Sequence, residues 1–110
     1  MPIAWDDFAK VDLRIGRIVS AEPFPEARKP AYRLRVDFGP LGLMTSSAQV
    51  TARYRPWDLV GRLVVGVVNL PPKRVAGFVS EVLVLGAMAG PEDVILLAPD
   101  QDAPPGTSIG

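Results

Sequence analysis

The feature that most constrains this fold is the alternation of apolar and polar residues in short segments separated by glycine and proline. In the clearest case, residues 32–38, Tyr, Leu, Val and Phe alternate with Arg, Arg and Asp. A period of two places all the apolar side chains on one face of a β-strand. Residues 11–15 repeat this alternation, whereas residues 63–68 are apolar on both faces, which is typical of a buried strand. The sequence therefore predicts an almost entirely β structure.

Further segments predict a small barrel with two short helices. We expect strands also over residues 43–50, 82–85 and 94–98, and helical turns over residues 5–8 and 56–59. Gly16, where the apolar alternation slips, predicts a bulge or sharp bend in a strand shared by both sides of the barrel. The strand count fits a five-stranded OB-fold, an SH3-like barrel or a small sandwich. The helix between the third and fourth strands favours the all-β OB-fold.

Composition excludes several classes of function. A chain of 110 residues has room for one domain, residues 1–110. The absence of Cys and His excludes disulfides, thiol chemistry, His-based catalysis and the usual metal sites. No phosphate-binding glycine motif or nucleophile motif is present, so we expect no enzyme activity, no cofactor and no metal. The N-terminus lacks an apolar signal segment, and no apolar run suits membrane insertion.

Charge is segregated along a chain whose net charge is zero. Residues 28–74 contain nine basic and two acidic residues, whereas residues 75–110 contain five acidic residues and no basic one. This asymmetry favours an anionic partner for the middle of the chain. The alternative is that the arginines only solvate the outer faces of strands, and charge alone leaves both interpretations open.

Two stretches carry groups suited to binding a macromolecule. Residues 46–49, Ser-Ser-Ala-Gln, lie at a strand end, where they suit contacts to sugar, base edges or peptide backbone, or an ordinary turn. Residues 69–80 are predicted to be a long loop that combines Pro-Pro, two cations, a glycine and an aromatic ring. The candidate binding residues are Arg33, Ser46, Ser47, Gln49, Arg53, Asn69, Pro71, Lys73, Arg74, Phe78 and Ser80.

The two ends of the chain offer more hydrophobic surface than one small barrel buries. We therefore expect a symmetric homodimer formed by the N-terminal turn and by strands in the C-terminal third. The candidate interface residues are Trp5, Phe8, Leu85, Met88, Ile95 and Leu97.

The sequence resembles the tRNA-binding domain family. The resemblance lies in residues 8–16 (Phe-Ala-Lys-Val-Asp-Leu-Arg-Ile-Gly), 36–39 (Val-Asp-Phe-Gly), 69–73 (Asn-Leu-Pro-Pro-Lys), Gly77 and 80–81 (Ser-Glu). Within that family the chain is most similar to free-standing CsaA-type proteins, over residues 24–28, 46–49, 71–78, 80–86 and 99–101.

The resemblance implies an OB-fold, a cytoplasmic homodimer and an export-related chaperone that binds unfolded or precursor polypeptides without ATP. It also implies a tRNA-binding fold, so tRNA is the second expected partner. The tRNA-binding members carry His-Pro, Ser-Gly and Met where this chain has Phe24-Pro25, Ser46-Ser47 and Leu83. We therefore rank polypeptide binding ahead of tRNA binding.

Overall fold

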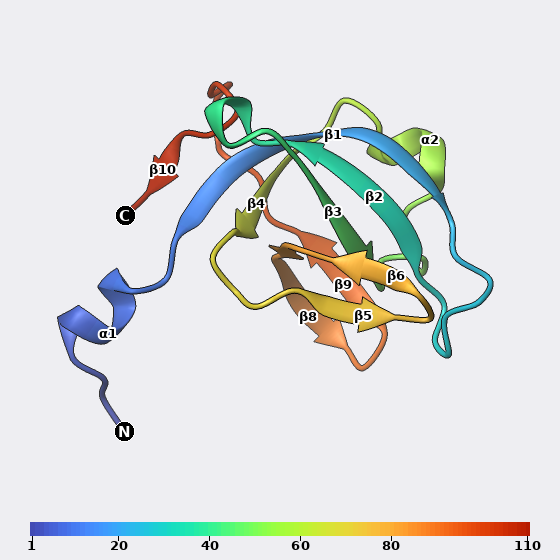
Figure 1. Cartoon of the computed structure of the whole chain (residues 1–110), viewed down its shortest axis with the longest axis horizontal. Helices are drawn as coiled ribbons and strands as arrows, with labels where there is room; N and C mark the ends of the chain where they lie inside the picture. Colours follow the sequence, from blue (N-terminus) through green and yellow to red (C-terminus); the bar gives the residue numbers. More distant parts are fainter.

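Short strands and two small helices make up the fold of this computed structural model, which describes all residues, 1–110 (Figure 1). The elements in chain order are α1 (Trp5–Ala9), β1 (Leu13–Pro23), β2 (Tyr32–Asp37), the 3-10 turn η1 (Gly39–Leu41), β3 (Leu43–Ala48), α2 (Pro56–Leu59), β4 (Leu63–Val67), β5 (Lys73–Val75), β6 (Phe78–Ser80), β7 (Leu83–Val84), β8 (Gly86–Gly90), β9 (Asp93–Leu96) and β10 (Ser108–Ile109). Both α1 and α2 are shorter than a bilayer-spanning helix would have to be.

The main sheet forms a nearly closed antiparallel barrel. Its strand order is β3-β2-β1-β4-β7, with β10 beside β1. The two ends of the sheet meet where the backbone N–H groups of Glu81 and Val82 donate hydrogen bonds to the carbonyl oxygen of Thr45, at 2.8 and 3.2 Å. The predicted five-stranded OB-fold barrel is confirmed, as are the N-terminal helix and the helix between the third and fourth strands.

Strand β1 is the long strand that both sides of the barrel share. Its first half pairs with β4 and its second half pairs with β2. The bulge that we predicted at Gly16 lies instead at Val19, where the register with β2 shifts between Ile18 and Ser20. Gly16 meets a different requirement, because the core leaves no room for a side chain there.

The aromatic ring of Phe38 fills the centre of the barrel. Phe38 is completely buried, together with Ile18 and Leu34. A Cβ atom on Gly16 would lie 2.7 Å from Phe38 Cε1, and one on Gly66 would lie 2.9 Å from Phe38 Cζ. Glycine is therefore required in both β1 and β4, because the ring packs directly against their backbones.

Two hairpins and one short strand add to the predicted elements. The predicted loop over residues 69–80 contains the hairpin of β5 and β6. The chain after β7 forms a second hairpin, of β8 and β9, and β10 lies in a tail that we expected to be irregular. These strands are only two to five residues long, so their alternation is too brief to recognise in the sequence.

Adding one methyl group at Gly66 tests the packing of the core ring. We expect Gly66→Ala to lower the free energy of unfolding by about 1–3 kcal/mol, because the new Cβ collides with Phe38 and Val82. Urea denaturation followed by circular dichroism measures the change. Gly110→Ala is the control, since a Cβ there meets nothing within 4 Å. Equal stability of the two variants would contradict the role of the ring.

Candidate macromolecule-binding site

The β5–β6 hairpin turns tightly at Ala76 and Gly77. Their φ angles are +47° and +84°, both in the left-handed region. Successive left-handed residues are characteristic of two-residue hairpin turns whose twist matches that of the strands, and glycine adopts this conformation without strain. The turn sets Lys73 opposite Ser80 and Val75 opposite Phe78, so these four side chains share one face of the hairpin.

Side chains at the end of the hairpin satisfy the free edge of β3. The N–H of Thr45 donates to Glu81 Oε1 at 3.0 Å, and the N–H of Ser47 donates to Ser80 Oγ at 3.0 Å. The hydroxyl of Thr45 donates to the carbonyl oxygen of Val79 at 2.7 Å. The hairpin is thus fixed beside the barrel by hydrogen bonds to donors that an open sheet edge would leave unpaired.

Two aromatic rings and a guanidinium connect the hairpin to β2. The rings of Phe24 and Phe78 meet edge to face, with centroids 5.5 Å apart. The Arg33 guanidinium lies 5.2 Å from the centroid of Phe24, a cation–π contact. Arg33 Nε, shielded from solvent, lies 3.1 Å from Glu22 Oε1 but without hydrogen-bond geometry. The contacts hold the guanidinium in place, and a third of its side chain remains exposed.

Exposed cations and exposed apolar groups surround this cluster. Arg35, Lys73 and Arg74 are exposed and form no ion pair. Leu43 and Val79 are 52% and 38% exposed. A surface of this kind suits an extended ligand with both charged and apolar groups. We define the hairpin site as Arg33, Arg35, Leu43, Ser47, Lys73, Arg74, Phe78, Val79 and Ser80.

The structure brings together six of the predicted binding residues in the hairpin site. Arg33 lies opposite Ser47 across β2 and β3, and Ser47 is hydrogen-bonded to Ser80. Lys73, Arg74 and Phe78 belong to the same hairpin as Ser80. Ser80 has a structural role beside any contact that it makes with a ligand, since its hydroxyl satisfies the edge of β3.

Five other predicted binding residues lie outside the hairpin site. Ser46 is 1% exposed, because the alternation of β3 turns it into the barrel, so its side chain is not accessible to a ligand on the surface. The amide of Asn69 is fully used: its Nδ2 donates to the Lys10 carbonyl at 2.6 Å, and its Oδ1 accepts from the N–H of Asp12 at 2.9 Å. Pro71 is exposed in the segment before β5.

The remaining two, Gln49 and Arg53, lie in the segment after β3. Gln49 lines a separate hollow at the end of the barrel. Arg53 forms a bidentate ion pair with Asp93 at the start of β9, with Arg53 Nη2 2.9 Å from Asp93 Oδ2. Arg53 therefore fastens the C-terminal hairpin to the barrel.

Residues that sequence reasoning missed complete the hairpin site. Phe24, Glu22, Thr45 and Glu81 all contact predicted residues directly. Glu81 lies 36 positions from Thr45 in the chain, so no local pattern reports their contact. The apolar Phe24 beside Pro25 was the one signal, since an aromatic ring in a proline-rich turn is 4% exposed only if something packs on it.

Comparisons with known proteins identify the family. Residues 13–108 match the model of the putative tRNA binding domain. The chain belongs to the tRNA-binding domain family. It is 47% identical, over 94% of its length, to methionine–tRNA ligase 1 of Sorangium cellulosum, of which it spans only 15%.

Solved structures place the chain with the CsaA type of this family. The chaperone CsaA of Bacillus anthracis is 55% identical and superposes with a TM-score of 0.97 over the whole of both chains. The CsaA chaperone protein of Picrophilus torridus is 45% identical, with a TM-score of 0.93 over 99% of this chain and all of that one. The predicted resemblance to CsaA-type members of the tRNA-binding domain family is confirmed.

The Arg53–Asp93 pair predicts a loss of stability in acid. The hydrogen bonds from Arg53 hold the pKa of Asp93 below the ordinary aspartate value of 3.8, an effect that desolvation partly opposes. A carboxylate with a lowered pKa in the folded state stabilises the protein above its unfolded pKa, and this contribution disappears as the pH falls through the folded value. Between about pH 6 and about pH 2, we expect the thermal midpoint of the wild type to fall further than that of Asp93→Asn.

The comparison uses Asp100→Asn as its control, because Asp100 is exposed and forms no ion pair. That variant should lose as much in acid as the wild type does. If all three proteins lost the same number of degrees, the ion pair would have no part in acid stability.

Proposed function

We propose that this protein is a chaperone that binds unfolded or precursor polypeptides for export, in the cytoplasm and without ATP. The observation that carries the proposal is the match of the whole chain to two CsaA chaperones, at 55% and 45% identity. Recognition of an extended chain requires surface and hydrogen-bonding groups but no reacting centre. The proposed activity is therefore binding without catalysis.

The hairpin site supplies the groups that such binding requires. Strand β5 pairs only with β6, so its other edge can pair with an extended peptide through main-chain hydrogen bonds. Main-chain pairing is independent of sequence, as the binding of diverse clients demands. Leu43 and Val79 offer apolar contacts, and the unpaired Lys73 and Arg74 attract acidic segments.

A second candidate function is tRNA binding, which the family model and the methionine–tRNA ligase relative favour. In the hairpin site, four cations (Arg33, Arg35, Lys73 and Arg74) suit contacts with phosphates. The two functions depend on different members of the same surface. They are therefore separable by substitution and by salt.

One titration experiment distinguishes the two functions. We expect Leu43→Ser combined with Val79→Ser to weaken the binding of an unfolded polypeptide by about tenfold or more, because the apolar contact is lost. Lys73→Met combined with Arg74→Met should leave that binding within about twofold, and it should lower the salt dependence of tRNA binding by about two phosphate contacts. Fluorescence anisotropy at about 50 mM and about 200 mM salt measures both affinities.

Val60→Ser is the matched control, because Val60 is 53% exposed beside α2, outside the hairpin site. Equal losses of polypeptide binding in Val60→Ser and in the Leu43/Val79 variant would remove the hairpin site from the proposal. Failure of the wild type to bind any unfolded polypeptide would sink the chaperone function itself.

We further propose that the protein works as a homodimer. Figure 1 shows α1 standing apart from the barrel. Trp5 and Phe8 on this helix are 91% and 44% exposed and lie beside a hollow that also contacts Ile109 of β10. Apolar residues presented on a projecting helix of five residues gain little in water alone, and a second subunit provides the surface that would cover them.

The C-terminal hairpin offers the second part of the proposed interface. Of the four residues predicted there, Leu85, Ile95 and Leu97 share one face: Ala87 pairs with Ile95, and the N–H of Leu97 donates to the Leu85 carbonyl. That face is opposite to the one from which Val94 and Leu96 pack on the core. Met88, paired with Val94, belongs to the core-facing side but is 66% exposed at its rim.

The dimer is tested with two tryptophans. We expect Trp5→Ser to weaken the dimer by about tenfold or more, because a large aromatic side chain leaves the interface. Trp57→Ser should leave it unchanged, since Trp57 is 75% exposed on α2, outside the proposed interface. Sedimentation equilibrium at micromolar concentration measures the association. A monomeric wild type would rule out the dimer.

A further inference from the structure

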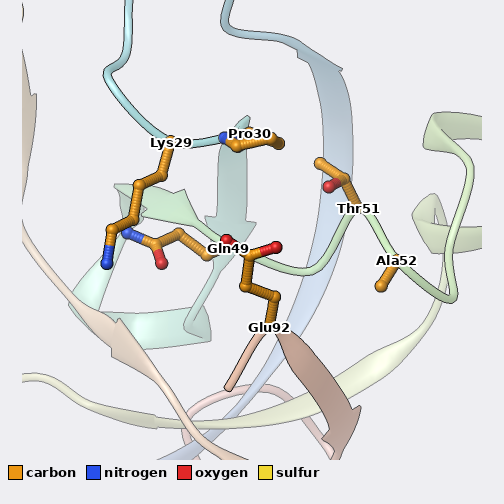
Figure 2. A pocket seen from close by; sticks show the side chains of 6 residues that line it. All are labelled: Lys29, Pro30, Gln49, Thr51, Ala52 and Glu92. Carbon is orange, nitrogen blue, oxygen red and sulfur yellow. The ribbon is translucent and has the colours of Figure 1, made fainter. Parts of the chain in front are cut away.

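A hollow at the end of the barrel is lined by polar groups that the hairpin site does not use. Its volume is about 190 Å³, and its lining comes from three segments: Lys29 and Pro30 before β2, Gln49, Thr51 and Ala52 after β3, and Glu92 between β8 and β9. Figure 2 shows the side chains of Lys29, Gln49 and Glu92 converging from these three segments. The hollow has room for about six water molecules, or for one small planar ring system.

All the polar side chains in this hollow lack partners within the protein. The side chains of Lys29, Gln49, Thr51 and Glu92 make no hydrogen bond or ion pair. Lys29 and Glu92 have opposite charges and line the same hollow, yet they do not pair with each other. A cation, an amide and a carboxylate are thus available together to a ligand that carries both acceptors and donors.

The hollow continues the row of side chains that crosses the hairpin site. Thr45 and Ser47 point outward from β3, and Gln49 follows at the next position of the same alternation. Lys29 and Pro30 lead directly into the end of β2 that carries Arg33. A nucleic acid strand whose phosphates contact the cations of the hairpin site can therefore reach the hollow with an unpaired base.

The edges of the four RNA bases differ in how well they match these groups. Guanine presents two adjacent donors, N1–H and the N2 amino group, beside the acceptor O6. A carboxylate has two acceptor oxygens and no donor, so it accepts from both guanine donors at once. Adenine and cytosine would set a ring-nitrogen lone pair against the carboxylate, and uracil offers one donor between two acceptors. Guanine is the base whose pattern fits a carboxylate with a cation beside it.

We propose that this hollow binds the Watson–Crick edge of an unpaired guanine in single-stranded RNA. Glu92 accepts from N1–H and the N2 amino group, and Lys29 donates to O6. The amide of Gln49 adds a donor or an acceptor, and Pro30 provides an apolar surface at the edge of the hollow. Recognition of single-stranded bases through this edge is a usual mode of RNA binding. The proposal rests on RNA binding, the second candidate function above.

The test uses short oligouridines that contain one central guanosine or one central inosine, which lacks only the N2 amino group. We expect the wild type to bind the guanosine strand about tenfold more tightly, the discrimination typical of one bidentate contact. Glu92→Gln should reduce this ratio to about one, because the amide replaces one acceptor by a donor. Asp100→Asn, which removes one carboxylate outside the hollow, should leave the ratio unchanged.

Each outcome of the titration decides the proposal. Equal binding of the guanosine and inosine strands by the wild type would overturn it, as would a preference that survives in Glu92→Gln. Binding of unfolded polypeptide without any RNA binding would overturn it and leave the chaperone function standing. A guanosine preference without polypeptide binding would support the hollow and remove the chaperone function.

Discussion

The rest of the structure depends on the direct contact between one aromatic ring and two strand backbones. Phe38 ends the β2 segment, and its ring occupies the space that side chains at Gly16 and Gly66 would take. This close approach lets β1 and β4 curve around a single small core, so that a short sheet nearly closes. A barrel of 110 residues has no second core to compensate if this packing fails.

Closure of the barrel also explains why binding and stability use the same residues. The free donors of β3 are satisfied by Ser80 and Glu81, which follow the exposed strand pair of the hairpin site. The barrel therefore anchors the hairpin, and the hairpin in turn protects a sheet edge from unwanted pairing. A serine that looks like a ligand contact in the sequence is already engaged by a backbone N–H in the fold.

Alternation in the sequence predicts the barrel strands and one face of the site, because these features depend on neighbouring residues. Arg33 and Phe78 could be found in this way. The inward direction of Ser46 could not, since it depends on the register of β3 against β2, where Ser46 lies opposite the buried Leu34. The contacts of Glu81 and the pair of Arg53 with Asp93, 40 positions apart, arise only when the chain closes on itself.

Asn69 makes two surfaces of the molecule mechanically dependent on each other. Its amide grips the backbone of Lys10 and Asp12, where the chain leaves α1, and its own backbone begins the segment that leads to β5. A ligand that shifts this segment also shifts the origin of the projecting helix. By thermodynamic linkage, a subunit that holds the helix then changes ligand affinity by the same factor as the ligand changes subunit association.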